Sequence, residues 1–297
     1  MSPARLALSL TPLLPACGSA GGTSPDDGAT GAGGAAGAGG AAPTVTLPDP
    51  GAPPASVNGV FSFEKLQRAG GVEVQGSALY TNPPQPLNTE RRPVMLKLYD
   101  EVPLGGCKLI QPGLSIGGAS PQLVKPGTVK IMAGGGVATV PNNPIGIPSG
   151  ALPAASWIPL TTYTLDVSGG AIGHVTGEFT TPGDLVVTSP APSDARLKLD
   201  RTSPFPITWT GQPDGRPVWI HLDQGTTRIT CRAEDTGAFE IPAATLGMLG
   251  PTSSAPGPND QPDRLTIERY TWYVVGSGQG VTLVISTVDA KLDLDVD

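Results

Sequence analysis

The chain has 297 residues, of which 41 are Gly and 34 are Pro, and its formal net charge is −7. Gly and Pro make up about a quarter of the residues without a three-residue period, which excludes collagen and argues against a helical bundle. Acidic side chains outnumber basic ones and no cluster of Lys and Arg is present, so we expect no nucleic-acid partner.

The N-terminal residues have the pattern of an export signal. One cationic side chain, Arg5, precedes a short apolar stretch at 6–14, which is too short to span a bilayer but right for a signal-peptide core. The sequence Leu14-Pro15-Ala16-Cys17 follows directly. This resembles the lipobox of bacterial lipoproteins, in which the cysteine becomes the acylated mature N-terminus.

The lipobox resemblance implies a lipoprotein signal peptide at 1–16 and lipidation of Cys17 by diacylglycerol and palmitate. Gly18 stands where Asp would retain a lipoprotein in the inner membrane, so the resemblance points to an outer-membrane lipid anchor in the cell envelope. The alternative is an ordinary secretory signal with a chance cysteine near the cleavage site, which would give a soluble secreted protein.

The segment behind Cys17 has the composition of a linker. Among residues 18–56, 34 of 39 are Gly, Ala, Pro, Ser or Thr, and none is Lys or Arg. Such a segment cannot bury enough apolar surface to offset chain entropy, so 17–56 is predicted to be a disordered tether. A random coil of this length has an end-to-end distance of about 35 Å. A long tether directly behind a cysteine favours the lipoprotein interpretation.

The remainder of the chain is predicted to be all-β. Frequent Gly and Pro exclude long helices, and alternation with a period of two recurs between turn residues. In the first half the alternating runs are 72–75, 94–99, 128–131, 163–167, 172–179 and 184–188. In the second half they are 207–210, 218–223, 228–232, 237–242, 265–269 and 281–285, with one or two helical turns at 243–249. We therefore expect one or two antiparallel β-sandwich domains.

The second half carries a further resemblance. The runs PGDLVVTSPAP, ITWTG, VWIHL, ITC and GAFEIPAATL are similar to immunoglobulin-like and fibronectin-III-like modules of predicted bacterial lipoproteins. The resemblance covers about 170–290 and implies an architecture without a chemistry. Pro190-Ala-Pro192 is taken as the boundary, which gives a β-rich domain at 57–189 and an immunoglobulin-like or fibronectin-III-like sandwich at 190–297.

Cysteine usage fits an oxidising compartment. If Cys17 is acylated, Cys107 and Cys231 remain, and a disulfide between them would join the two halves of the chain. Two buried free thiols are the alternative, because an even count says nothing about the distance between the two residues.

Several short motifs match catalytic or metal-binding patterns without their context. Gly113-Leu-Ser115-Ile-Gly117 matches a nucleophile elbow, but the Pro and Gly residues around it leave no helix to follow. Ser62-Phe-Glu-Lys65 lacks the companion motifs of penicillin-binding enzymes. Gly134-Gly135-Gly136 lacks the Lys of a phosphate loop and is more simply a hairpin turn. We expect no cofactor, metal site or enzymatic activity.

The C-terminal run Asp293-Leu-Asp295-Val-Asp297 alternates like an edge strand. It lacks the Gly and the distant Glu of a calcium loop, so its charges are expected to discourage pairing with another chain.

One face of a predicted strand is a candidate ligand-binding surface. Trp219, His221 and Asp223 alternate with three aliphatic residues on one predicted strand. If this face were exposed, the indole could stack on a sugar ring while the polar neighbours bind its hydroxyls. The alternative, which we favour, is that Trp219 packs under a loop or against the first half.

The sequence thus predicts a lipid-anchored, non-enzymatic β-sandwich with a binding or scaffolding role at the cell envelope. Its partners would be the membrane, through the lipid, and a glycan or another envelope protein. The alternatives are a carbohydrate-binding or adhesive surface module and a hydrolase with an unrecognised site. The hydrolase would need a pocket that gathers His174 or His221 with a nucleophile and a carboxylate.

Overall fold

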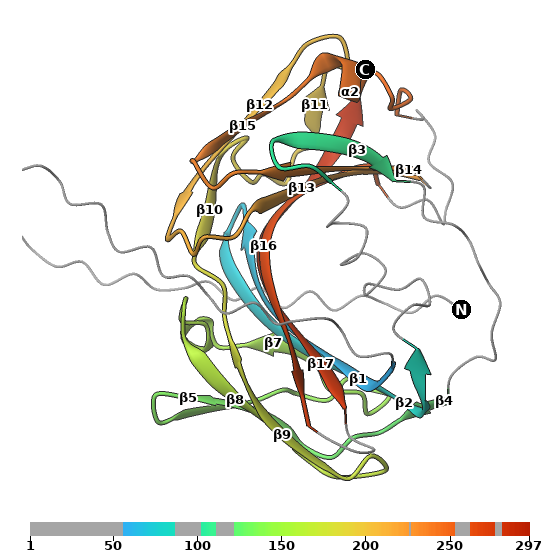
Figure 1. The fold of residues 1–297 in the computed structure, drawn as a ribbon, viewed down its shortest axis with the longest axis vertical. Coiled ribbons are helices and arrows are strands. Elements are labelled where there is room, and N and C mark those ends of the chain that lie inside the picture. Colours follow the sequence, from blue (N-terminus) through green and yellow to red (C-terminus); the bar gives the residue numbers. More distant parts are fainter. Residues whose placement is uncertain (1–55, 87–101, 111–121, 226, 253–261, 277–280) are drawn as a thin grey trace, which may run out of the picture. The chain divides into compact units, whose positions relative to one another are not determined.

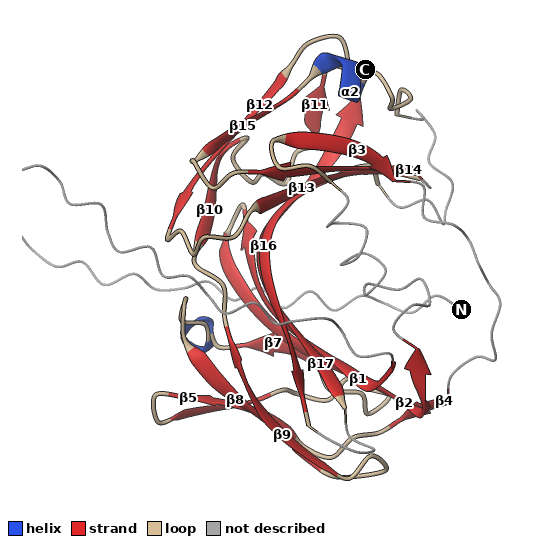
Figure 2. Cartoon of the chain, in the orientation of Figure 1, coloured by secondary structure: helices blue, strands red, loops and turns tan. Residues whose placement is uncertain are grey.

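The computed structural model describes residues 56–86, 102–110, 122–225, 227–252, 262–276 and 281–297. These residues belong to one compact unit, Ala42–Asp297. Most of them are in strands, and the helical elements among them are two short turns, η1 (Ala154–Ser156) and α2 (Ala243–Leu246), so the fold is all-β as predicted (Figures 1 and 2). The signal peptide, Cys17, the tether, the run 94–99 and the motif at Ser115 lie outside the described residues.

The largest sheet has nine strands. Its path is β14 (Thr227–Ala233), β13 (Val218–Gln224), β16 (Arg264–Val275), β17 (Thr282–Val296), β1 (Ser56–Arg68), β2 (Gly71–Pro86) and β4 (Gln122–Val124). β11 (Leu197–Leu199) pairs with β17, and β7 (Ser149–Leu152) pairs with β2. Pairing in this sheet is antiparallel except at β1–β17 and β11–β17, which are parallel.

Two smaller antiparallel sheets accompany the large one. One has the order β10 (Leu185–Ser189), β12 (Phe205–Gly211) and β15 (Ala238–Ile241). The other has the order β6 (Gly136–Thr139), β5 (Val129–Ala133), β8 (Thr162–Ser168) and β9 (His174–Thr180). β3 (Gly106–Ile110) lies beside β14, where Leu104 makes an isolated parallel bridge to Arg232.

The pairing of β1 with β17 joins the two ends of the described chain. Gly59 is opposite Thr282 and Gln67 is opposite Ala290, and Figure 1 shows the two strands side by side. The segments 57–189 and 190–297, which the sequence analysis separates at Pro190, therefore share one sheet. β17 also shows that the expected C-terminal edge strand is wrong, because Asp293 pairs with Arg264 and Leu294 pairs with Leu197.

A single large hydrophobic core takes residues from all three sheets. On β1, the period of two puts Phe61 and Phe63 on the core face, and both are fully buried. The ring of Phe63 contacts Tyr163 of β8 and Phe179 of β9, with centroid distances of 5.4 and 6.1 Å. Trp209 of β12 is buried in the same core, as its alternation predicts. The three sheets are thus held together by apolar packing.

The glycine triplet forms the predicted hairpin turn. Ala133 pairs with Gly136, which leaves Gly134 and Gly135 as a two-residue connection between β5 and β6. Both have positive φ, at 54° and 83°, as a type I′ turn requires, and this explains why the turn is built from glycine. Ser62 and Lys65 lie three residues apart on β1, so they are on opposite faces of a strand and cannot act together.

A buried arginine joins the large sheet to the three-stranded sheet. Arg269 of β16 is 1% exposed, and its guanidinium lies beside Asp235 and Asp214. It also donates hydrogen bonds to the backbone carbonyls of Asp184 and Gln212, at 2.8 and 2.7 Å. These carbonyls and carboxylates satisfy most of the donors of a cation that is otherwise costly to bury.

Candidate functional site

The second face of the large sheet is polar and aromatic, in contrast to its core face. Cross-strand register puts residues of β13, β16, β17, β1 and β2 into rows on this face. The side chains that the rows bring together are Trp219, His221, Asp223, Arg264, Thr266, Glu268, Tyr270, Asp289, Lys291, Asp293, Glu64 and Gln75. Because titratable side chains gather on this face, it is the candidate location of a functional site.

Trp219 is not an exposed platform, so the sugar-stacking hypothesis is wrong at this residue. Its side chain is 5% exposed and packs in a small hydrophobic cluster with Val102 and Ile110. Its ring stacks on Tyr270 with centroids 6.2 Å apart, and Arg232 lies over it at 5.5 Å. Val102 and Ile110 come from the first half of the chain, so Trp219 packs in the way that the favoured alternative predicts.

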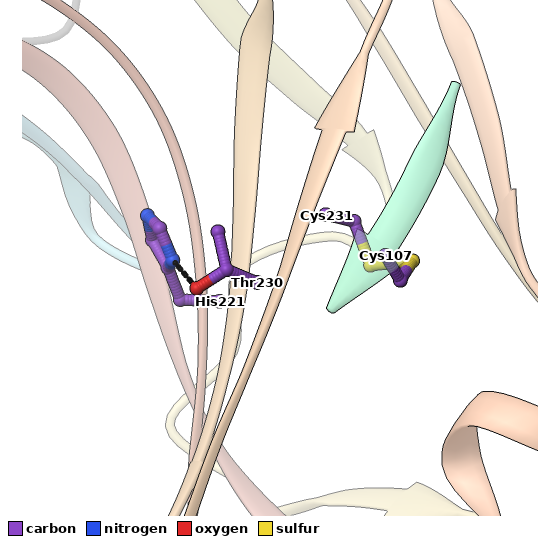
Figure 3. Close-up of a disulfide and its surroundings, with 4 residues drawn as sticks. All are labelled: Cys107, His221, Thr230 and Cys231. Atoms are coloured by element: carbon purple, nitrogen blue, oxygen red, sulfur yellow. Dashed lines mark hydrogen bonds between the residues drawn. A yellow bond between two sulfur atoms is a disulfide. The ribbon is translucent and has the colours of Figure 1, made fainter. Parts of the chain in front are cut away.

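His221 is buried among polar partners on the same row. Its Nδ1 lies 3.1 Å from the Thr230 hydroxyl and its Nε2 lies 3.2 Å from Oε1 of Glu268, and Figure 3 shows the contact with Thr230. A hydroxyl, an imidazole and a carboxylate in a row is the arrangement that a hydrolase would need. However, Thr230 is 0% exposed and His221 is 3% exposed, so a substrate cannot reach the hydroxyl. We interpret this row as a satisfied buried hydrogen-bond network.

Asp223 and His174 also have local partners. Asp223 forms a two-point ion pair with Arg228 of the neighbouring strand β14. His174 is exposed on the four-stranded sheet, where its Nε2 lies 2.7 Å from Asp166. Trp219, His221 and Asp223 therefore share a face, as the alternation predicts, but they do not form a ligand site.

Cys107 and Cys231 are joined by a disulfide (Figure 3). The sequence alone does not distinguish this disulfide from two buried free thiols. The bond connects β3 to β14 across 124 residues of chain. It lies next to the backbone hydrogen bond from Gly105 to the carbonyl of Arg232, at 2.7 Å. The disulfide therefore fixes the segment that covers Trp219.

A compact charge cluster lies where β1 meets β17. The Lys291 ammonium forms an ion pair with Glu64 of β1 and lies 2.9 Å from Oδ2 of Asp289. Asp289 is 2% exposed, whereas Lys291 and Glu64 keep about a quarter of their side-chain surface. Glu268 is the residue opposite Asp289 on β16. Two carboxyl groups thus hold one lysine on this face, and a third lies on the neighbouring strand.

The cluster shifts the pKa of two of its members. Burial, and then the nearby charge of Glu64, raise the pKa of Asp289 well above its usual range, against the opposing effect of Lys291. Burial alone would lower the pKa of Lys291, but the attraction of Asp289 and Glu64 outweighs it and raises that pKa. Asp289 therefore retains a proton more readily than an ordinary carboxyl group while Lys291 stays charged.

A cleft opens directly beside this cluster. Its volume is about 300 Å³, and its lining residues come from β1, β2, β16, β17 and the loop between β10 and β11. The charged lining residues are Glu64, Arg68, Asp194, Arg264, Lys291 and Asp293, and the others are Leu66, Ala69, Gln75, Pro192 and Ser193. Three cations and three carboxylates therefore line one concave surface.

The two arginines of the cleft are held by loose pairs, in contrast to Lys291. Nε of Arg264 lies 3.5 Å from Oδ1 of Asp293, and Nε of Arg68 lies 3.5 Å from Oε2 of Glu73. Gln75 donates a hydrogen bond to Glu73 at 2.7 Å. Both Nε–oxygen distances are longer than a normal hydrogen bond, so the carboxylates position the two guanidinium groups without forming a hydrogen bond to Nε. The cleft is the candidate functional site of the described residues.

Sequence reasoning did not find this cleft. Its residues come from four strands and a loop that are far apart in the sequence, and none belongs to a recognisable motif. Asp293 was noticed only as part of the charged C-terminal run. The available signal was that Glu64 and Arg68 of β1 are spaced by an even number of residues, which puts both on one face of the strand.

The described residues contain no group of three His, Cys, Asp or Glu side chains that could hold a metal ion. Among the same residues, neither helical turn has the length or the apolar character needed to cross a membrane.

Comparisons with known proteins assign the chain to no family. No protein-family model matches the chain, and no curated protein matches it. Among solved structures, a Ca²⁺-stabilized adhesin with which an Antarctic bacterium binds ice shares 12% identity at a TM-score of 0.19. That match covers 82% of this chain and 50% of the adhesin chain, so the chain spans about half the length of the adhesin.

A tandem of titin Ig domains gives a similar result. It shares 12% identity at a TM-score of 0.18, and the match covers 65% of this chain and 90% of the titin chain. At these TM-scores neither match indicates the fold or the ligand of this chain.

Proposed function

We propose that the chain is a lipid-anchored binding protein of the bacterial cell envelope. Cys17 would carry the lipid, residues 17–56 would be the tether, and the β unit would present a binding surface away from the membrane. The observation that carries the proposal is the order of these features: an apolar stretch, a cysteine, a segment rich in small residues and then a compact all-β unit.

A binding role without catalysis is supported by the placement of the histidines. Each of the two histidines of the chain is held by a carboxylate, and the hydroxyl beside His221 is buried. The cleft at Glu64 and Arg264 is lined by charged and polar side chains and by no histidine. Such a surface can bind a polar ligand, but it offers no activated nucleophile.

The anchor is tested by expressing the full chain and a Cys17→Ala variant in a Gram-negative host. We expect the wild-type mass to fit cleavage before Cys17 plus acyl groups, and the protein to sediment with the outer membrane. The variant should be lost from the membrane because one unacylated chain has no anchor. If both proteins are soluble and unacylated, the anchor proposal is wrong and a secreted binding module replaces it.

A further inference from the structure

We propose that the cleft at Glu64 and Arg264 binds a neutral saccharide of one or two rings. This inference refines the proposed function by assigning the binding site and the class of ligand. The cleft does not include Trp219, and in it charged side chains, instead of an aromatic ring, would recognise the hydroxyl groups of the sugar. The cleft lies between the strands β1 and β2, the strands β16 and β17, and the loop residues 192–194.

The balance of charge in the cleft argues for a neutral ligand. A phosphate or carboxylate would gain contacts with Arg68, Arg264 and Lys291, but it would face the three lining carboxylates at the same range. A cationic ligand would meet the opposite problem. A sugar hydroxyl both donates and accepts hydrogen bonds, so a polyol can satisfy carboxylates and guanidinium groups together.

Arg264 supplies a donor without an acceptor. Its Nε is buried and makes no hydrogen bond, because the nearest carboxylate oxygen, on Asp293, is 3.5 Å away. A buried N–H of this kind costs free energy until it meets an acceptor. Nε itself is out of reach of the cleft, but the Arg264 side chain is 38% exposed, so a ligand hydroxyl could accept a hydrogen bond from the outer part of its guanidinium group and donate one to Asp293. The missing acceptor at Nε of Arg264 is independent of the balance of charges in the cleft.

The remaining lining residues fit the other face of a sugar ring. Ala69 and Pro192 provide apolar surface, whereas Gln75 and Ser193 provide neutral donors and acceptors. A volume of about 300 Å³ is at the lower end of the range for ligand pockets, which suits one or two rings better than a long chain. Lys291 is already held by Glu64 and Asp289, so part of the site is ordered before a ligand binds.

The test uses the full chain carrying Cys17→Ala and a panel of probes. The neutral probes are glucose, galactose, N-acetylglucosamine and their β-1,4-linked disaccharides, and inorganic phosphate is the charged probe. Binding is measured by ligand-observed NMR and by calorimetry. We expect saturable binding of at least one neutral sugar and weaker binding of phosphate. Saturable phosphate binding that exceeds every sugar would overturn the inference.

Variants place the binding in the cleft. Gln75→Ala and Asp194→Ala each remove one hydrogen-bonding side chain from the lining, and each should weaken sugar binding about tenfold. His174→Ala is the matched control, because His174 is exposed on the four-stranded sheet and should leave binding unchanged. Equal melting temperatures check that the variants fold. Sugar binding that survives both cleft substitutions would contradict the assignment.

The outcome is separable from that of the anchor experiment. If no neutral sugar binds at about 20 mM, above the millimolar range of weak sites, the saccharide inference fails even when the wild-type chain is acylated and membrane-bound. If the wild-type chain is soluble but its cleft binds sugar, the anchor proposal fails and the saccharide inference stands.

Discussion

Arg269 on the large sheet and Asp235 beside the three-stranded sheet form a direct ion pair, with Nη2 and Oδ2 2.5 Å apart. The other oxygen of Asp235 accepts a hydrogen bond from Nε1 of Trp209 at 2.9 Å. Asp214, on the other side of Arg269, accepts from the backbone N–H groups of Gly183 and Arg216. The pair therefore connects a core tryptophan, two loops and strand β16 of the large sheet.

Replacing Arg269 by Met should be strongly destabilising. The substitution keeps the volume but leaves Asp214 and Asp235 buried beside no cation, which costs about 3–5 kcal/mol of unfolding free energy. Urea denaturation followed by fluorescence measures the loss. The control is Arg68→Met, because Arg68 and Glu73 form an exposed pair worth less than about 1 kcal/mol. Similar losses in the two variants would show that the buried pair carries no special weight.

Removing the disulfide should loosen the segment that covers Trp219. The double variant Cys107→Ala/Cys231→Ala loses a cross-link that closes a long loop, and we expect a loss of about 2–5 kcal/mol. Because Val102 and Ile110 pack on Trp219, the emission of this indole should shift to the red in the native baseline. Trp219→Phe in both backgrounds identifies the contribution of this residue. An unchanged spectrum would mean that the cover stays in place without the bond.

Asp289→Asn should change the dependence of stability on pH. The pKa of Asp289 is raised in the folded state, so the stability from this group is complete below its unfolded pKa of about 3.9 and is lost as pH rises through its folded pKa. Asn mimics the protonated form and removes this loss. The stability of the variant relative to wild type should therefore increase from pH 4 to pH 8 in urea denaturation.

Asp200 provides a control of opposite sign for this pH experiment. Hydrogen bonds from the hydroxyl and the backbone N–H of Thr202, and from Ser203, lower the pKa of Asp200. Its contribution is present above its unfolded pKa and is lost as pH falls, so Asp200→Asn should lose stability relative to wild type as pH rises. Two variants with the same slope would contradict the assigned directions.

Gly59→Ala should be destabilising for a purely steric reason. The ring of Tyr80 lies over Gly59, its partner on the neighbouring strand, and a Cβ at residue 59 would be 2.1 Å from two ring atoms. Because Tyr80 is buried and cannot move freely, we expect a cost of about 1–3 kcal/mol.

The control for this substitution is Gly70→Ala, because nothing lies within 4 Å of a Cβ at residue 70. The double variant Gly59→Ala/Tyr80→Leu should recover part of the loss, since the smaller side chain makes room. Full tolerance of the single substitution would contradict the packing described for this pair.

The alternation of side chains predicts most of the strands but not their partners. Runs such as 163–167 and 218–223 lie within β8 and β13, because a strand with one core face shows a period of two locally. β1 lacks a sustained signal, because Lys65 and Gln67 continue the face of Phe61 and Phe63 with polar side chains that bond to Asp184 and Val187. Its pairing with β17 depends on contacts across more than 200 residues, which no local pattern records.

The candidate site could not be predicted for the same reason. Alternation correctly puts Trp219, His221 and Asp223 on one face, but whether that face meets solvent depends on the segment that carries Val102 and Ile110. The cleft needs Glu64, Arg264 and Lys291 together, and only the register of β16, β17 and β1 brings them into one place.

The pairing of the first described strand with the last sets an order of events for folding. A ribosome releases Phe61 long before Val284, yet the two are neighbours in the folded sheet. β1 therefore cannot pair on this side until β17 has been synthesised. Contacts of such large sequence separation make folding slow and leave apolar strand edges uncovered in the interval. A chain that lacks the 15 residues of β17 would lose the central strand of the large sheet, to which β16, β1 and β11 are paired. Nascent fragments of this protein should therefore depend on chaperones until synthesis is complete.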